Sequence, residues 1–271
     1  MIESIPPHNT MTDDLDRSIR AIYDAFSGYE FTDQIGDAAF PGSCNIKELH
    51  SVSLRSATSD QLDLFASDAA CTWGTSEDFR HFLPRICELV AIEGQEGTIM
   101  PQIPFSALPR LSWREWPTAE VAVLEKYLDC LRDRSLNSFP QLDGGGINDP
   151  SHAWTLDAAH LWFETIAIAT GETEPFLSAW RQQLEAESLA ALVNLAAVFL
   201  DLTVYQKGKA PWNFFDHGSP IENEFLSWLR NIHPSSLLEQ AFDRLEGSPL
   251  GPLFSTAQQQ AERFSGGAEP R

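Results

Sequence analysis

Apolar residues recur at helical spacing along most of this chain. Near its start, Leu15, Ile19 and Ile22 are three to four residues apart, and most later segments repeat this spacing. Because an α-helix has about 3.6 residues per turn, side chains spaced in this way share one face. The pattern predicts an all-α fold of about ten helices stacked as antiparallel pairs, either an irregular helical bundle or a short α-solenoid.

The expected helices are separated by a few irregular stretches. They cover residues 15–26, 59–71, 76–93, a segment opened by Pro117, and residues 155–170, 174–187, 188–204, 220–231, 235–246 and 251–264. Residues 28–58 are expected to be irregular, with weak strand or turn character at 50–56, and residues 94–112 to be loop. Pro84 falls inside the third helix, so we expect a kink there or two short helices that meet at Leu83–Pro84.

The segment FPQLDGGGINDP, residues 139–150, is the clearest linker in the chain because it holds three consecutive glycines and two prolines. It predicts an N-terminal helical half at residues 12–138 and a C-terminal helical half at residues 151–264. The two halves either stay separate or pack together as one compact unit.

The chain is strongly acidic, with 39 acidic against 18 basic residues and a formal net charge of −21. Such a charge repels the phosphates of nucleic acids and anionic membrane surfaces, and it attracts a basic protein. We therefore expect a basic protein partner, and neither a nucleic acid nor a membrane. The alternative is that the charge serves solubility alone.

The most distinctive segment is CTWGTSEDFRHFLPRICELV, residues 71–90. Thr75 and Asp78 are spaced as a capping box that begins a helix. On the polar side of this helix lie His81 and Arg85, one turn apart, with Arg80 adjacent. These three side chains could bind an anion or take part in acid–base chemistry. The alternative is that the polar side only forms ion pairs within the protein.

Asp157, His160 and Glu164 also share one face of an expected helix, where a carboxylate, an imidazole and a second carboxylate could bind a metal. No second helix bearing histidine offers matching ligands, so a surface ion-pair face is favoured and no metal site is predicted. The four cysteines form no CxxC pair, which argues against a zinc site or a disulfide framework.

A long loop, residues 207–220, is rich in aromatic residues. Trp212, Phe214 and Phe215, together with Asp216, are the predicted anchor for a partner, because aromatic side chains dominate interface energetics. The alternative is that these rings pack into the core between the flanking helices. The sequence has no P-loop, GxGxxG, HExxH or GxSxG motif, so we assign no catalytic residue and no cofactor, and a non-enzymatic protein is favoured.

Residues 15–135 resemble a widespread family of uncharacterised bacterial proteins. The resemblance is carried by a Trp-Gly pair, an acidic-Phe-Arg-His-Phe-Leu-Pro-Arg run, a Glu-Leu pair and a Trp-Pro-x-x-Glu helix start. The matching positions are Trp73, Gly74, Asp78, Phe79, Arg80, His81, Phe82, Leu83, Pro84, Arg85, Glu88, Leu89, Trp116, Pro117 and Glu120. The family implies no activity that can be transferred to this chain.

Three hypotheses for the function follow. The leading one is a cytoplasmic, non-enzymatic binding protein, most concretely an immunity-type inhibitor that masks a basic bacterial toxin domain. The first alternative is an enzyme or small-ligand-binding protein with an anion pocket at Arg80, His81 and Arg85. The second alternative is a helical scaffold. Cytoplasmic placement follows from the first sixteen residues, in which we find neither a basic nor an apolar segment of the kind a secretory signal needs.

Overall fold

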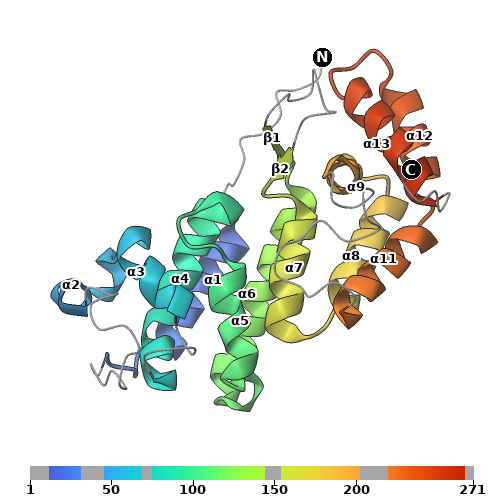
Figure 1. Ribbon diagram of the computed structural model, residues 1–271. Coiled ribbons are helices and arrows are strands. Elements are labelled where there is room, and N and C mark those ends of the chain that lie inside the picture. Colours follow the sequence, from blue (N-terminus) through green and yellow to red (C-terminus); the bar gives the residue numbers. More distant parts are fainter. Residues whose placement is uncertain (1–11, 32–45, 69–74, 144–153, 202–218, 266–271) are drawn as a thin grey trace. The chain divides into compact units, whose positions relative to one another are not determined.

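The computed structural model describes residues 12–31, 46–68, 75–143, 154–201 and 219–265 (Figure 1). The described residues form twelve α-helices and one two-stranded antiparallel ladder, so the all-α expectation is confirmed. The helices are α1 (Asp13–Ala25), α2 (Ile46–Ser51), α3 (Ser59–Asp68), α4 (Ser76–Glu93), α5 (Gln102–Arg110), α6 (Thr118–Asn137), α7 (Ala159–Thr170), α8 (Glu174–Glu185), α9 (Leu189–Leu200), α11 (Pro220–Asn231), α12 (Pro234–Leu245) and α13 (Gly251–Ser265).

Single 3-10 turns and the ladder complete the described elements. The turns are η1 (Leu54–Ser56), η2 (Gly94–Glu96) and η3 (Trp113–Glu115). Strand β1 (Gln141–Asp143) pairs antiparallel with β2 (Trp154–Leu156), with Leu142 opposite Thr155.

The chain divides into two compact units. The N-terminal unit holds the described residues of Asn9–Leu131 and of Ile168–Thr170, and the C-terminal unit holds those of Arg132–Ala167 and Gly171–Arg271. The division falls within α6. The expected linker at 139–150 lies mostly outside the described residues, so the two expected halves, 12–138 and 151–264, stay a prediction.

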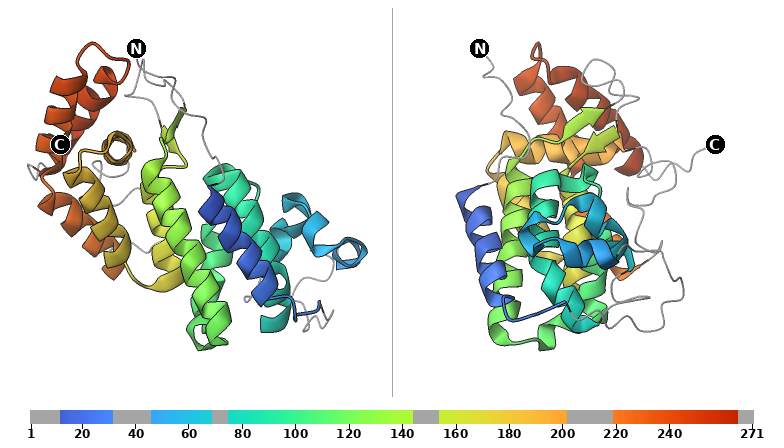
Figure 2. Two further views of the ribbon diagram at one scale, coloured as in Figure 1. Left: turned by 180° about the vertical axis from the view of Figure 1, so that it is seen from behind. Right: turned by 90° about the vertical axis from the view of Figure 1, so that its left-hand side faces the viewer.

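In the N-terminal unit, α1 packs against α4, and α3 packs against both α4 and α5; the first of these pairs can be followed in Figures 1 and 2. The apolar face read from the sequence of α1 is the face that is buried, since Leu15 and Ile22 are inaccessible to solvent. On α4, Phe79 and Phe82 are likewise buried. The helical spacing of apolar residues therefore identified the core of this unit.

Helix α4 begins and ends where its sequence predicts. The Thr75 hydroxyl accepts a hydrogen bond from the Asp78 amide at 3.1 Å, and the Asp78 carboxylate accepts one from the Thr75 amide at 2.8 Å. Gly94 ends the helix with φ at 71°. The helix runs without interruption through Pro84, so the alternative of two short helices is wrong. Pro84 has no N–H to donate to the Arg80 carbonyl, and the hydrogen bonds on either side keep the helix continuous.

Two stretches expected to be irregular contain helices. Helix α2 and the turn η1 occupy part of 28–58 and replace the weak strand character expected at 50–56. Helix α5 occupies nine residues of the loop expected at 94–112. In α5, Pro104 lies in the first turn, where a backbone N–H has no helical acceptor, so this proline does not interrupt the helix. Phe105 and Leu108 of α5 are fully buried, and this burial favours the helix.

The C-terminal unit is built around α9, in which every residue from Ala190 to Leu200 is buried. Helices α12 and α13 pack on each other and on α9. The Asn194 amide, fully buried in α9, accepts a hydrogen bond from the Ala159 amide at 2.8 Å and donates to the carbonyls of Ser138 at 2.8 Å and Ala190 at 3.0 Å. One side chain thus joins the start of α7 and the segment after α6 to the central helix.

Sequence predicted the helix boundaries of this unit closely. The expected helix 220–231 matches α11, and the Ser219 hydroxyl caps it by accepting a hydrogen bond from the Glu222 amide. The expected helix 155–170 begins later, at Ala159, because the residues before it pair as β2. Gly171 ends α7 at a φ of 73°, a left-handed conformation that glycine adopts without steric cost.

Among the described helices, none alone has the length and apolar character of a membrane span; the bent pair α8 and α9 meets that test only when the two helices are taken together.

Candidate functional site

The Arg80 side chain of α4 contacts the segment after α1 and the start of α6. Its guanidinium donates a hydrogen bond of 2.7 Å to the Tyr29 hydroxyl and lies 3.9 Å from the Glu120 carboxylate. It also lies over the Trp116 ring, 4.3 Å from the ring centroid, which adds a cation–π contact. The guanidinium thus contacts a hydroxyl, a carboxylate and an aromatic ring.

The Tyr29 hydroxyl links the two charges of this cluster. It donates to the Glu120 carboxylate at 2.7 Å while it accepts from Arg80. Burial raises the pKa of Tyr29, and the hydrogen bond to Glu120 raises it further. The phenol therefore stays protonated at neutral pH and keeps donating to Glu120, whose side chain is almost fully buried.

His81 lies next to Arg80 and faces aromatic rings. Its Nδ1 atom is 2.8 Å from the Tyr29 carbonyl oxygen, and its ring meets the Phe82 ring edge-on with centroids 4.7 Å apart. The Phe31 ring stacks near it, at 6.3 Å between centroids. One imidazole nitrogen is therefore occupied by a backbone carbonyl.

Arg85 lies one turn after His81 and forms a second cluster. Its Nε donates to the Ala57 carbonyl at 2.7 Å, and a terminal nitrogen donates to the Glu88 carboxylate at 2.6 Å. The same Glu88 oxygen accepts the Tyr23 hydroxyl of α1 at 2.6 Å. Burial, and then the bond to Glu88, raises the pKa of Tyr23 well above its usual range. Arg85 and Glu88 thus join α4 to α1 and to the turn after η1.

The three residues of the hypothetical anion pocket therefore have partners inside the N-terminal unit. Arg80 and Arg85 each face a carboxylate, and a bound anion would have to displace it. Their side chains are largely buried, with Arg80 at 17% and Arg85 at 15% exposure. This geometry favours a structural role for the motif, in which its side chains join α4 to α1, to α6 and to the segments that follow α1 and η1. The expected ion pairs along one helix are represented by Arg85 with Glu88.

The predicted partner anchor, Trp212, Phe214, Phe215 and Asp216, lies outside the described residues. Trp73 and Gly74, which begin the family motif, also lie outside them. Their roles stay predictions.

The group Asp157, His160 and Glu164 does not form a surface ion-pair face, because His160 is fully buried and Glu164 is 1% exposed. Asp157 accepts the indole N–H of Trp162 at 2.7 Å instead. The His160 Nε2 atom lies 3.8 Å from the Asp201 carboxylate, too far for a hydrogen bond. Within the described part of the chain, no three or more His, Cys, Asp or Glu side chains lie close enough together to hold a metal ion.

Cys87 and Cys130 are free and buried thiols. Burial raises the pKa of Cys87 well above its usual range, so its thiol stays protonated and unreactive. Cys44 and Cys71 lie outside the described residues.

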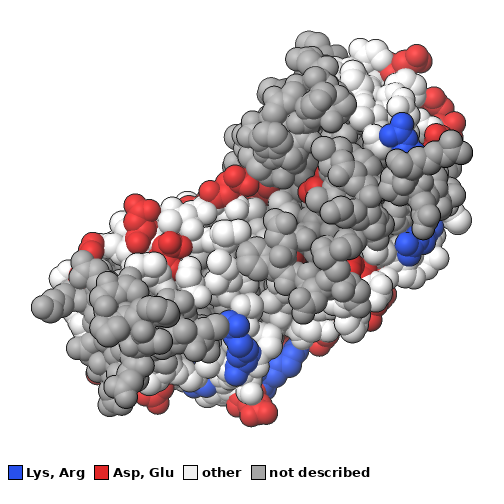
Figure 3. Space-filling model, in the orientation of Figure 1, with Lys and Arg blue, Asp and Glu red and all other residues white. Residues whose placement is uncertain are grey.

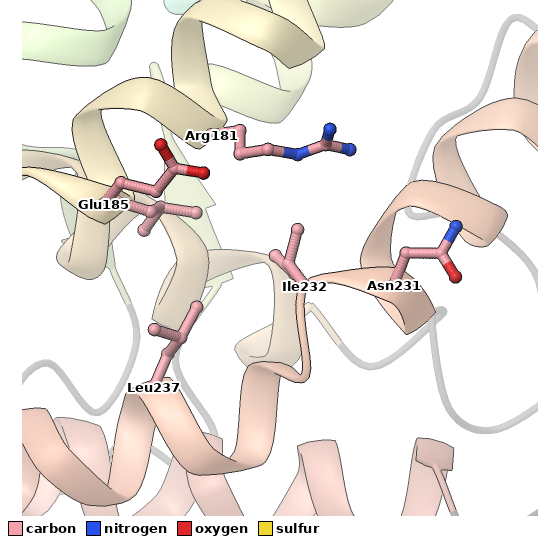
Figure 4. Close-up of a pocket in the computed structure, with 6 residues that line it drawn as sticks. Arg181, Glu185, Asn231, Ile232 and Leu237 are labelled. Atoms are coloured by element: carbon pink, nitrogen blue, oxygen red, sulfur yellow. The ribbon is translucent and has the colours of Figure 1, made fainter.

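A pocket that the sequence did not indicate lies in the C-terminal unit (Figure 4). It is lined by Arg181, Leu184 and Glu185 of α8, by Asn231 and Ile232 at the end of α11, and by Leu237 of α12. Its volume is about 240 Å³. Arg181 and Glu185 are one turn apart and could have been assigned to one helix face from sequence. Their spacing does not indicate the rest of the pocket lining, which comes from α11 and α12, about fifty positions later in the chain.

Seven arginines of the described residues form ion pairs with neighbouring acids. The paired ones are Arg17, Arg20, Arg80, Arg85, Arg114, Arg132 and Arg244. Exposed carboxylates outside these pairs include Asp24, Glu30, Glu239 and Glu246. On the face drawn in Figure 3, red acidic side chains stand at more places than blue basic ones, and both are separated by uncharged surface.

No family model, curated protein or solved structure matches this chain. The resemblance to the uncharacterised bacterial family therefore stays a prediction that depends on the motif residues.

Proposed function

We propose that this chain is a non-enzymatic binding protein of the cytoplasm that recognises a basic protein, most concretely an immunity-type inhibitor of a basic bacterial toxin domain. The observation that supports this proposal is the charge arrangement. The chain has 39 acidic against 18 basic residues, and seven arginines pair with acids within the described residues, so the acids outside these pairs still outnumber the remaining bases. Such a surface accelerates encounter with a cationic surface, and the acceleration falls as salt rises.

The contacts of Arg80, His81 and Arg85 support the same proposal, because they weaken its main alternative, the anion pocket. Arg80, His81 and Arg85 are the best candidates for anion chemistry in the chain, and each has a partner inside the N-terminal unit. Their contacts are those expected of residues that hold helices together, and they give the anion-pocket alternative no support. The buried Cys87 thiol is also unsuited to nucleophilic chemistry, because burial keeps its pKa high.

The proposal is tested by purifying the chain with its partners from the native host. We expect a basic protein to co-purify, its association rate to fall steeply between low and physiological salt, and co-expression of this chain to abolish its toxicity. The proposal fails if the chain is recovered alone, if the association is insensitive to salt, or if the recovered protein stays toxic in its presence.

Two matched charge reversals show which unit the partner approaches. The variant Asp24→Lys/Glu30→Lys alters the N-terminal unit, and Glu239→Lys/Glu246→Lys alters the C-terminal unit. Each turns two exposed acids into two lysines, which changes the net charge by four, from −21 to −17. Because the two variants have the same total charge, any difference between their association rates reports local steering. The variant on the partner's side should associate more slowly.

A further inference from the structure

The pocket between α8, α11 and α12, called here the α8–α12 hollow, has the size of one large side chain. Its volume is about 240 Å³. Pockets for drug-sized ligands are larger, about 300–1,000 Å³, whereas a cavity of about 150 Å³ already holds a benzene molecule. The hollow therefore fits a single aromatic or large aliphatic side chain better than it fits a cofactor or a nucleotide.

The floor of the hollow is apolar and rigidly supported. Leu184 is buried, and Ile232 and Leu237 are half-buried around it. One turn before Leu184 and Ile232 on the same helices lie Trp180 and Trp228, both buried, with ring centroids 5.1 Å apart. The Trp180 indole also donates to the Ala191 carbonyl of α9 at 3.2 Å. These packed indoles fix the spacing of α8 and α11, so the hollow is preformed.

The rim of the hollow carries groups that are free to bind. Arg181 and Glu185 are exposed, and neither side chain forms a hydrogen bond or ion pair with any residue in the described part of the chain. Figure 4 shows the Arg181 guanidinium extending over Ile232 and the Glu185 carboxylate on the same side, while the Asn231 amide points away from both. A donor and an acceptor thus stand at one edge of an apolar floor.

We propose that the α8–α12 hollow receives one aromatic side chain of a basic protein partner. Glu185 pairs with a lysine or arginine beside that anchor, and Arg181 donates to a backbone carbonyl flanking it. Such an arrangement, a desolvated anchor inside a polar rim, is where interfaces concentrate their binding energy. Arg181 and Glu185 offset each other at the rim, so the net charge of −21 on the whole chain decides the preference for a basic neighbour over a small anion. This inference rests on the proposed function and names the docking site for it.

The test uses short peptides and the whole chain, with backbone amide chemical shifts measured by NMR. The probe is N-acetyl-Lys-Phe-Lys-amide. Its controls are N-acetyl-Lys-Ala-Lys-amide, which has the same charge without the ring, and N-acetyl-Glu-Phe-Glu-amide, which has the ring with the opposite charge. We expect saturable shifts at residues 181–185 and 231–237, with binding weakened about tenfold or more when Phe is replaced by Ala. Binding should also weaken when the lysines are replaced by glutamates.

The variant Leu237→Trp fills the hollow and should abolish these shifts, while Leu64→Trp, which adds an indole at an exposed site of the other unit, should leave them unchanged. Unaltered far-ultraviolet circular dichroism and melting temperature establish that both variants are folded. Equal shifts from the Ala peptide, tighter binding of the Glu peptide, or shifts confined to other residues would overturn the proposal. If Leu237→Trp still captures and neutralises a basic toxin, the hollow is not the docking site but the proposed function stands.

Discussion

Replacing Arg85 with Ala separates the structural role of the motif from the anion-pocket hypothesis. The substitution removes the hydrogen bond to the Ala57 carbonyl and the ion pair with Glu88. It leaves Glu88 in a site where its side chain is 22% exposed and where its remaining partner shown here is the Tyr23 hydroxyl. A structural role predicts a loss of folding free energy, whereas a ligand-binding role predicts lost binding with nearly unchanged stability.

The magnitude follows from burial. Exposed ion pairs contribute about 0–1 kcal/mol, but Arg85 and Glu88 are 15% and 22% exposed, so solvent screens them less. A hydrogen bond to a charged group contributes about 1.5–3 kcal/mol, and an acceptor left unpaired in a buried site costs about 1–3 kcal/mol. Allowing for relaxation and water entry, we expect Arg85→Ala to lower the free energy of unfolding by about 2–4 kcal/mol.

Urea unfolding measures this change, followed by circular dichroism and by tryptophan fluorescence, whose transitions must coincide for one free energy to apply. The matched control is Arg110→Ala, since the exposed Arg110 side chain donates to the Ser106 hydroxyl and to no other group in the described part of the chain; its effect should stay within about 0.5 kcal/mol. The double variant Arg85→Ala/Glu88→Gln should lose less free energy of unfolding than the two single variants together, because it no longer leaves the Glu88 carboxylate without its arginine. An Arg85→Ala protein as stable as the control variant would refute the structural reasoning.

Three further outcomes are expected. Replacing Asn194 with Leu should lower the stability of the C-terminal unit by about 2–5 kcal/mol and speed hydrogen exchange at the Ala159 amide, which loses its acceptor. Replacing Thr75 with Ala should cost about 1 kcal/mol in urea unfolding, because one half of the capping box is lost. The raised pKa of Tyr23 adds stability that is full below its ordinary value of 10.0 and is lost as the pH rises beyond it, so Tyr23→Phe should flatten the fall in stability in alkali.

Each of these outcomes has its own control. Asn137→Ala removes an exposed amide that donates to the Asp133 carbonyl, and unchanged protection of Ala159 is expected there. Thr75→Ser retains the hydroxyl and should restore the cap, so equal losses for Ala and Ser would contradict the capping account. An alkaline transition that is the same with and without the Tyr23 hydroxyl would show that other groups govern it.

The sequence predicted helix ends best where the residues that set them are close together in the chain. The Thr75 cap, the Ser219 cap and the bounds of α11 follow from residues within one helical turn. Helix α5 was missed, since residues 94–112 were expected to form a loop; the helix contains two prolines. The first, Pro104, lies where a helix tolerates proline, and the burial of Phe105 depends on packing that no local pattern contains.

The candidate sites show the same limit. Sequence placed Arg80 and Arg85 on the polar side of α4, and that side does face polar groups. Their partners, however, are Tyr29 and Glu120, and Ala57 and Glu88, of which only Glu88 is near in the chain. The burial of His160 could not be predicted either. Whether a histidine on a helix face is buried depends on which elements pack against that face, and the local sequence does not show them.

Helix α1 and the residues that follow it do more than cover apolar surface, because they carry two tyrosine hydroxyls that bind charged groups. Tyr23 and Tyr29 are the groups through which this segment satisfies Glu88, Arg80 and Glu120. A fragment beginning after Phe31 would lose both hydroxyls and would also expose the apolar surface of α4 that α1 covers. Shortening from this end should therefore yield a protein that aggregates or is degraded.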